Sequence, residues 1–142
     1  MLDHARPVAL LIARIAIGAI FLVHGYQKFA KMGIAGTTKF FESVGIPLAG
    51  LAAPGVAALE VVGGLAMILG AALPVVGTLL AINMVGAIVF VHGASGFSAD
   101  GGGYEFVMAL AAASLAIGFT GGGALALDNR MSRRRRTLIA PA

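Results

Sequence analysis

The chain of 142 residues contains no cysteine and no tryptophan, and only 11% of its residues are charged. Without cysteine it cannot form a disulfide, use a thiolate, or bind zinc or an iron–sulfur cluster through cysteine. So few charges cannot cover the surface of a soluble domain in which 59% of the residues are hydrophobic. The composition therefore predicts one small domain whose solvent is lipid.

The little charge that is present is unevenly placed. Of the ten basic residues, five lie in the C-terminal tail, at Arg130 and at positions 133–136. We expect residues 129–142 to form a basic, disordered cytoplasmic tail that can contact anionic lipid. Nucleic acid is not expected as a partner, because no aromatic residue or motif accompanies the arginines.

Four apolar stretches are long enough to cross a bilayer, at about 20 residues per crossing. Gly70 and Pro74 suit the break between the second stretch and the third. Residues 37–42 have the pattern of a short amphipathic helix lying at the interface. We therefore expect an all-α membrane protein, in which residues 1–128 form a four-helix transmembrane bundle with a short interfacial helix between spans 1 and 2. The expected spans cover about residues 7–25, 51–69, 75–91 and 104–121.

The basic residues also predict the orientation in the membrane. Arg6 and the arginine tail flank the first and last spans, and the positive-inside rule then places both termini in the cytoplasm, with the spans in the cell membrane. Lys28, Lys31 and Lys39 lie between spans 1 and 2 and count against this orientation.

Two ionisable residues, Arg14 and Glu60, fall inside predicted spans, where each charge costs about 2.5–3.5 kcal/mol. A rise of about 1.5 Å per residue gives them overlapping depths, within the uncertainty of the span ends. We expect them to form a buried ion pair inside the bundle. Such a pair would either take part in function or only fix the register of the helices.

Further polar residues gather at the outer ends of three spans. Two histidines, a lysine, a carboxylate and a phenol can move protons and hydrogen-bond a quinone carbonyl or an oxyanion. Asn83 and His92 are nine residues apart, about 180° round an ideal helix. Either span 3 ends before His92, or Asn83 serves another contact. No metal site is expected, because no HxxxH or ExxH spacing occurs. The candidate polar pocket consists of His24, Gln27, Lys28, His92, Tyr104 and Glu105.

Five stretches resemble the DoxX family of small bacterial membrane proteins. They are ARIAIGAIFLVHGYQKF (13–29), FFESVGIP (40–47), LEVVGGLAMILG (59–70), FVHGASGF (90–97) and GGYEF (102–106). The resemblance covers about residues 9–127 and implies a four-helix membrane fold and an oxidoreductase-associated membrane protein. It also implies a link to quinone-dependent thiosulfate oxidation and to oxidative-stress complexes. The family's characteristic positions, which carry no agreed roles, match Arg14, His24, Gly25, Lys28, Glu60, Gly63, Gly64, His92, Tyr104 and Glu105.

Two functions are left open. One is a membrane subunit of quinone-linked redox or oxidative-stress metabolism, which binds a quinone-like molecule between its helices and has no covalent cofactor. Because no cofactor motif is present, a soluble or membrane oxidoreductase would then supply the electrons.

The other function is that of a scaffolding subunit that anchors a partner enzyme or respiratory complex and has no catalysis of its own. A carrier is disfavoured by the lack of an inverted repeat or broken helix. Enzymatic activity and oligomeric state are left open.

Overall fold

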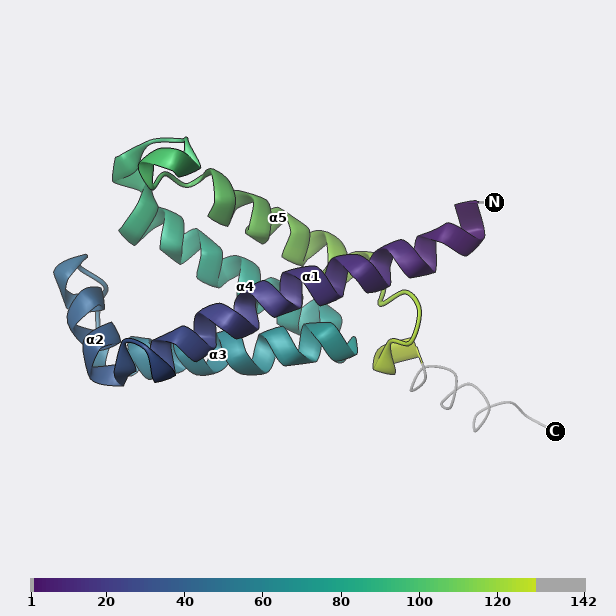
Figure 1. Ribbon diagram of the computed structural model, residues 1–142, viewed down its shortest axis with the longest axis horizontal. Coiled ribbons are helices and arrows are strands. Elements are labelled where there is room, and N and C mark those ends of the chain that lie inside the picture. Colours follow the sequence, from purple (N-terminus) through teal and green to yellow (C-terminus); the bar gives the residue numbers. More distant parts are fainter. Residues whose placement is uncertain (1, 130–142) are drawn as a thin grey trace.

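The computed structural model describes residues 2–129, which contain helices and no strand (Figure 1). The predicted tail from residue 130 onward lies outside the described residues. A π-helical turn, η1, continues α4, and two short 3₁₀ helices, η2 and η3, lie in the loop before α5. The elements are α1 (Leu2–Ala30), α2 (Gly33–Ser43), α3 (Ala49–Leu69), α4 (Leu73–Ala87), η1 (Ile88–His92), η2 (Gly93–Ser95), η3 (Ala99–Gly101) and α5 (Glu105–Thr120).

The predicted all-α membrane fold is confirmed. Three helical segments are long and apolar enough to cross a bilayer, namely Ala5–Ala30, Ala49–Leu69 and Leu73–Ser95. The fourth, α5, is a shorter apolar helix of 16 residues, or about 24 Å, which covers most of a hydrocarbon core about 30 Å thick. The interfacial helix α2 has 11 residues and so is longer than predicted.

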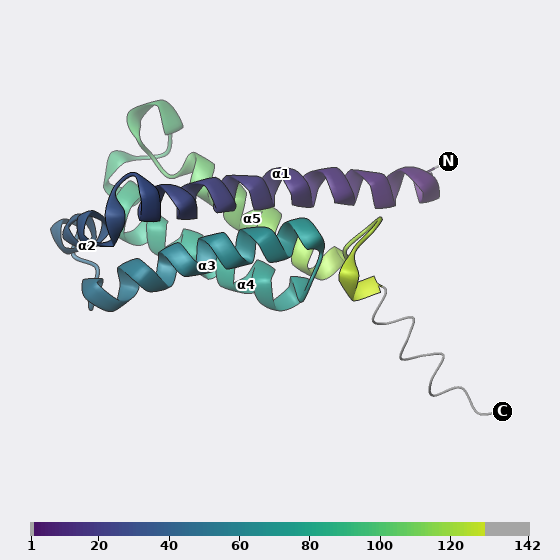
Figure 2. The same cartoon turned by 60° about the horizontal axis from the view of Figure 1, so that its bottom comes forward.

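The four long helices form two antiparallel pairs. Helix α1 packs along α3, and α4 packs along α5, while α1 and α5 make only limited contact. The pairs lie close together near the N-terminal end of α1 and diverge toward α2 and the loop before α5 (Figure 1). Figure 2 shows α2 crossing the end of the α1–α3 pair at the divergent end.

Glycines bring α1 and α3 into close contact. A Cβ atom added to Gly64 would lie 2.6 Å from the carbonyl oxygen of Gly18, and one added to Gly25 would lie 2.7 Å from the backbone nitrogen of Val61. In lipid the hydrophobic effect does not drive helices together, so close backbone packing stabilises the contact between α1 and α3. It also sets the register, with Gly18 beside Gly64 and Gly25 beside Val61.

The two helix pairs lie close together at one end of the bundle, which we call the closed end. The segment after α5 folds back over this end. The backbone nitrogen of Ala124 donates to the carbonyl oxygen of Pro7 at 2.9 Å. The Asp128 carboxylate accepts hydrogen bonds from the backbone nitrogens of Ala72 (2.8 Å) and Leu73 (2.9 Å), and so satisfies the first turn of α4. The two ends of the described chain therefore lie at the same end of the molecule (Figure 1).

Candidate functional site

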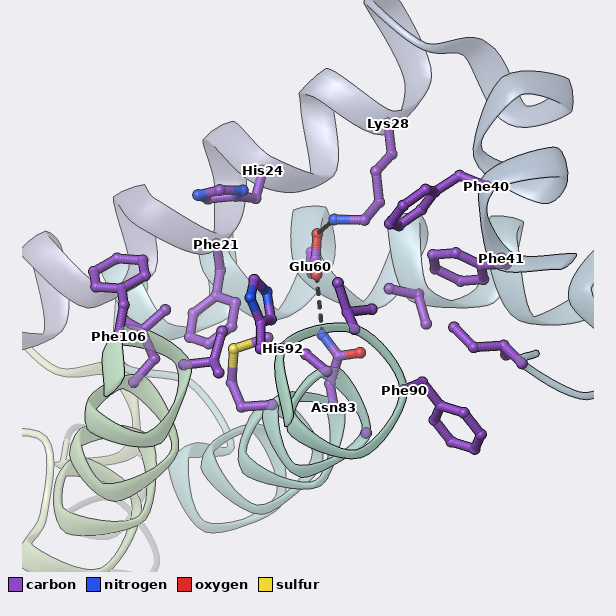
Figure 3. Close-up of a pocket in the computed structure, with 18 of the residues that line it drawn as sticks. Phe21, His24, Lys28, Phe40, Phe41, Glu60, Asn83, Phe90, His92 and Phe106 are labelled. Carbon is purple, nitrogen blue, oxygen red and sulfur yellow. Dashed lines mark hydrogen bonds and ion pairs between the residues drawn. The ribbon is translucent and has the colours of Figure 1, made fainter. Parts of the chain in front are cut away.

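A cavity of about 510 Å³ lies between the two helix pairs, at the end where they diverge (Figure 3). This is the size of a site for a small molecule. Most of its lining is apolar, and its aromatic side chains come from four elements, α1, α2, η1 and α5. They are Phe21, Phe40, Phe41, Phe90 and Phe106. The polar side chains that line the cavity are those of His24, Lys28, Glu60, Asn83 and His92.

A charged network joins three helices at the cavity wall. Lys28 Nζ forms an ion pair with Glu60 Oε2 at 2.6 Å, and Asn83 Nδ2 donates to Glu60 Oε1 at 3.0 Å (Figure 3). Both carboxylate oxygens are therefore hydrogen-bonded, although the Glu60 side chain is only 4% exposed. Pairing and hydrogen bonding together offset the cost of burying such a charge.

The register of α1 on α3 explains why Lys28 reaches Glu60. Because Gly25 packs beside Val61, Glu60 lies opposite the part of α1 near His24. Lys28 is one helical turn further along α1. Side chains on a helix lean toward its N-terminus, so the lysine extends back along α1 to the carboxylate.

The predicted pair between Arg14 and Glu60 is wrong. Arg14 is 1% exposed and lies at the closed end of the bundle, where its Nη2 donates to the carbonyl oxygen of Ala124 at 2.7 Å. Its Nη1 lies against Gly70, just after α3, leaving no room for a side chain there. Gly70 is ten residues beyond Glu60, or about 15 Å along a helix. The cation therefore meets the C-terminal end of α3, which the helix dipole makes favourable for positive charge.

A π-helical turn brings His92 to the cavity. Span 3 does not end before His92, because the α-helix to Ala87 continues as the π turn Ile88–His92 and the apolar segment runs on to Ser95. The π turn uses more residues per turn than an α-helix, so it rotates the residues that follow it. Both Asn83 and His92 consequently line the cavity. His92 Nδ1 lies 2.8 Å from the carbonyl oxygen of Gly102, in the loop before α5.

The other predicted pocket residues lie elsewhere. Tyr104 packs edge-on against Phe97, with the ring centroids 5.5 Å apart. Glu105 Oε2 accepts a hydrogen bond from the backbone nitrogen of Ala99 at 3.0 Å and so holds the loop. Gln27 is half-buried on α1 and does not line the cavity. Within residues 2–129, no three acidic or histidine side chains gather in a way that could hold a metal ion.

Two polar residues of the cavity were absent from the predicted pocket. The sequence pairs Glu60 with Arg14, and it leaves open whether Asn83 faces the same pocket as His92. A signal for both was present, since each is a rare polar residue in an apolar span. The phenylalanines offered no comparable signal, because aromatic residues are equally common in any hydrophobic core.

The chain is similar to several known membrane proteins. The DoxX family profile matches residues 9–93. CatD of Bacillus subtilis, provisionally named an oxidoreductase, is 38% identical over 127 residues, which covers 89% of this chain and 90% of CatD. YphA of Escherichia coli, named an inner membrane protein, is 34% identical over 131 residues and covers 89% and 92% of the two chains. An uncharacterized membrane protein of Mycobacterium tuberculosis is 30% identical, covering 92% and 86%. No solved structure matches the chain.

Proposed function

The chain belongs to the DoxX family of membrane proteins, and on that premise we propose that it is a membrane subunit of redox metabolism that binds a quinone-like molecule. The binding site is the cavity between the α1–α3 pair and the α4–α5 pair. Its volume of about 510 Å³ and its aromatic walls suit a flat, apolar ring.

The observation that carries this proposal is the charged network in an otherwise apolar cavity. An ionisable pair inside a membrane protein is expensive and marks a functional site by default. Lys28 uses one of its three N–H groups on Glu60 and keeps two for other acceptors, and its side chain is 18% exposed. A quinone offers two carbonyl oxygens on an apolar ring, which match such donors.

The chain's own residues bind and orient the ligand. Lys28 and His24 hydrogen-bond the head group, Glu60 holds the lysine in place, and the phenylalanines exclude water. Electrons pass to or from a partner oxidoreductase. The provisional name of the Bacillus relative is consistent with such an association.

The proposed orientation has both termini in the cytoplasm and the cavity in the outer half of the membrane. It is supported by Arg6 and the arginine-rich tail, together with the ends of the described chain lying at the same end of the molecule.

The binding proposal is tested by equilibrium dialysis of the purified protein in lipid nanodiscs against a benzoquinone with a decyl tail. The wild type should bind it. Glu60→Gln and His24→Ala should weaken binding by about tenfold, the cost of about 1.4 kcal/mol for one lost hydrogen-bonding group. Glu105→Gln is the matched control, because Glu105 does not line the cavity and a glutamine oxygen can still accept from the backbone nitrogen of Ala99. If the wild type does not bind, or if Glu60→Gln binds equally well, the scaffolding function is preferred.

A further inference from the structure

The hydrogen-bonding groups of the cavity divide into donors and acceptors whose roles are set by their protein partners. Asn83 is the first. A carboxylate paired with a lysine only accepts hydrogen bonds, so the nitrogen of the Asn83 amide must be the atom that faces Glu60. The amide oxygen then points away from Glu60 (Figure 3) and presents an acceptor to the cavity.

His92 is the second group with a set role. The carbonyl oxygen of Gly102 can only accept, so the nitrogen facing it, Nδ1, carries the proton. In the neutral ring Nε2 is then an acceptor. No partner for Nε2 is found within residues 2–129, and the ring lines the cavity.

The remaining polar groups supply few donors. Each oxygen of Glu60 already accepts one hydrogen bond, and Lys28 offers its two free N–H groups. The backbone nitrogens of Ala99, Gly102 and Gly103, which also line the cavity, are bonded within the loop. His24 makes no side-chain hydrogen bond within residues 2–129 that would set its tautomer, so it can donate or accept. Besides the Glu60 carboxylate, the cavity thus has two side-chain acceptors, Asn83 Oδ1 and, in the neutral ring, His92 Nε2.

Resting on the function proposed above, we propose that this site selects the reduced, hydroxyl-bearing form of its ligand, the quinol, over the quinone. A quinol hydroxyl donates to His92 Nε2 or Asn83 Oδ1, and its oxygen still accepts from Lys28. A quinone only accepts, so it would cover both acceptors and leave them unpaired. A buried polar group without a hydrogen-bond partner is destabilising by its full desolvation free energy. The quinol should therefore bind at least about tenfold more tightly than the quinone.

The test compares three ligands that share one ring and tail: the decyl-benzoquinone, its quinol under anaerobic reducing conditions, and the dimethyl ether of the quinol. Dissociation constants are measured by dialysis against wild-type protein in nanodiscs. The quinol should bind about tenfold or more tightly than the quinone, and the ether, which cannot donate, should bind no better than the quinone. The midpoint potential of the bound couple should rise by about 30 mV for each tenfold preference.

Variants assign the effect to the two acceptors. His92→Phe and Asn83→Leu should each reduce the preference for quinol to about threefold or less, while Thr78→Val, a polar-to-apolar change elsewhere on α4, should leave it intact. Should a variant fail to fold, the ether on wild-type protein still decides the matter. Equal binding of quinol and quinone, tighter binding of the quinone, or an unchanged preference in both variants overturns this inference and leaves the proposed function standing. If no ligand binds, the proposed function itself fails.

Discussion

Lys28 and Glu60 are joined by an ion pair of 2.6 Å that links α1 to α3 at the wall of the cavity. The pair depends on Asn83 from α4, which occupies the second carboxylate oxygen. Three helices from both halves of the molecule therefore meet at one carboxylate. The same contact that stabilises the fold thus also shapes the proposed site.

Removal of either partner should be more damaging than removal of both. Lys28→Met alone or Glu60→Gln alone leaves a buried polar group or charge without its partner, which should cost about 3 kcal/mol. The double variant should recover much of this loss, because neither charge then needs compensation. Thermal unfolding in detergent measures the three stabilities, with Lys31→Met, an exposed lysine, as the control. Additive losses in the double variant would contradict direct pairing.

Arg14 and Glu60 should show no energetic coupling. About 15 Å separates their positions along the bundle, and residues this far apart with no shared partner behave additively within about 0.3–0.5 kcal/mol. A double-mutant cycle with Arg14→Leu and Glu60→Gln checks this by thermal unfolding. A coupling above about 1 kcal/mol would restore the pair that the sequence alone predicted.

Arg14→Leu should also release the segment that folds over the closed end of the bundle. The lost hydrogen bond from Nη2 to the Ala124 carbonyl oxygen is one of the contacts that tie residues 121–129 to α1. Hydrogen exchange should become faster in that segment and stay unchanged around the cavity. Equal acceleration in both places would indicate general loss of structure.

Adding a methyl group to the α1–α3 contact should separate the helices. In Gly64→Ala the new Cβ would lie 2.6 Å from the Gly18 carbonyl oxygen, and relieving this overlap should cost about 1–3 kcal/mol. Gly55→Ala, on the same helix, is the matched control, because nothing lies within 4 Å of its Cβ. That variant should be neutral or more stable by up to about 1 kcal/mol. Thermal unfolding of the two proteins gives the comparison, and equal stabilities would contradict the proposed contact.

Gly93→Ala should displace His92. Its Cβ would lie 2.7 Å from the Ile88 carbonyl oxygen inside the π turn, so the turn must shift. Quinol binding should weaken by about tenfold, as expected for one lost hydrogen bond. Gly101→Ala, where the nearest atom is 4.0 Å away, serves as the control in the same loop. Unaltered binding by Gly93→Ala would show that the π turn does not position the histidine.

The orientation can be read with a reporter enzyme. An alkaline phosphatase is active only outside the cytoplasm, so a fusion after Ala142 should be inactive and a fusion near Asp100 should be active. The opposite pattern of activities would invert the proposed orientation and place the cavity in the inner half of the membrane.

The four apolar runs determined the helical membrane fold by themselves. In lipid every backbone polar group must be bonded within the protein, which leaves a long apolar segment no alternative to a helix. The residue types that line the cavity were visible for a related reason, because His24, Lys28, Glu60 and Asn83 are rare polar residues in or beside such runs.

Only the tertiary structure decided which of these groups meet. The partner of Glu60 depends on how far α1 is shifted along α3, and the glycine contacts at Gly18 and Gly25 set that shift. Arg14 and Lys28 are 14 residues apart on α1, or about 21 Å, so the register of α1 on α3 decides which of the two lies near Glu60. The π turn before His92 is likewise invisible in an apolar run. Hydropathy is a local property of one segment, whereas register and helix rotation are relations between segments.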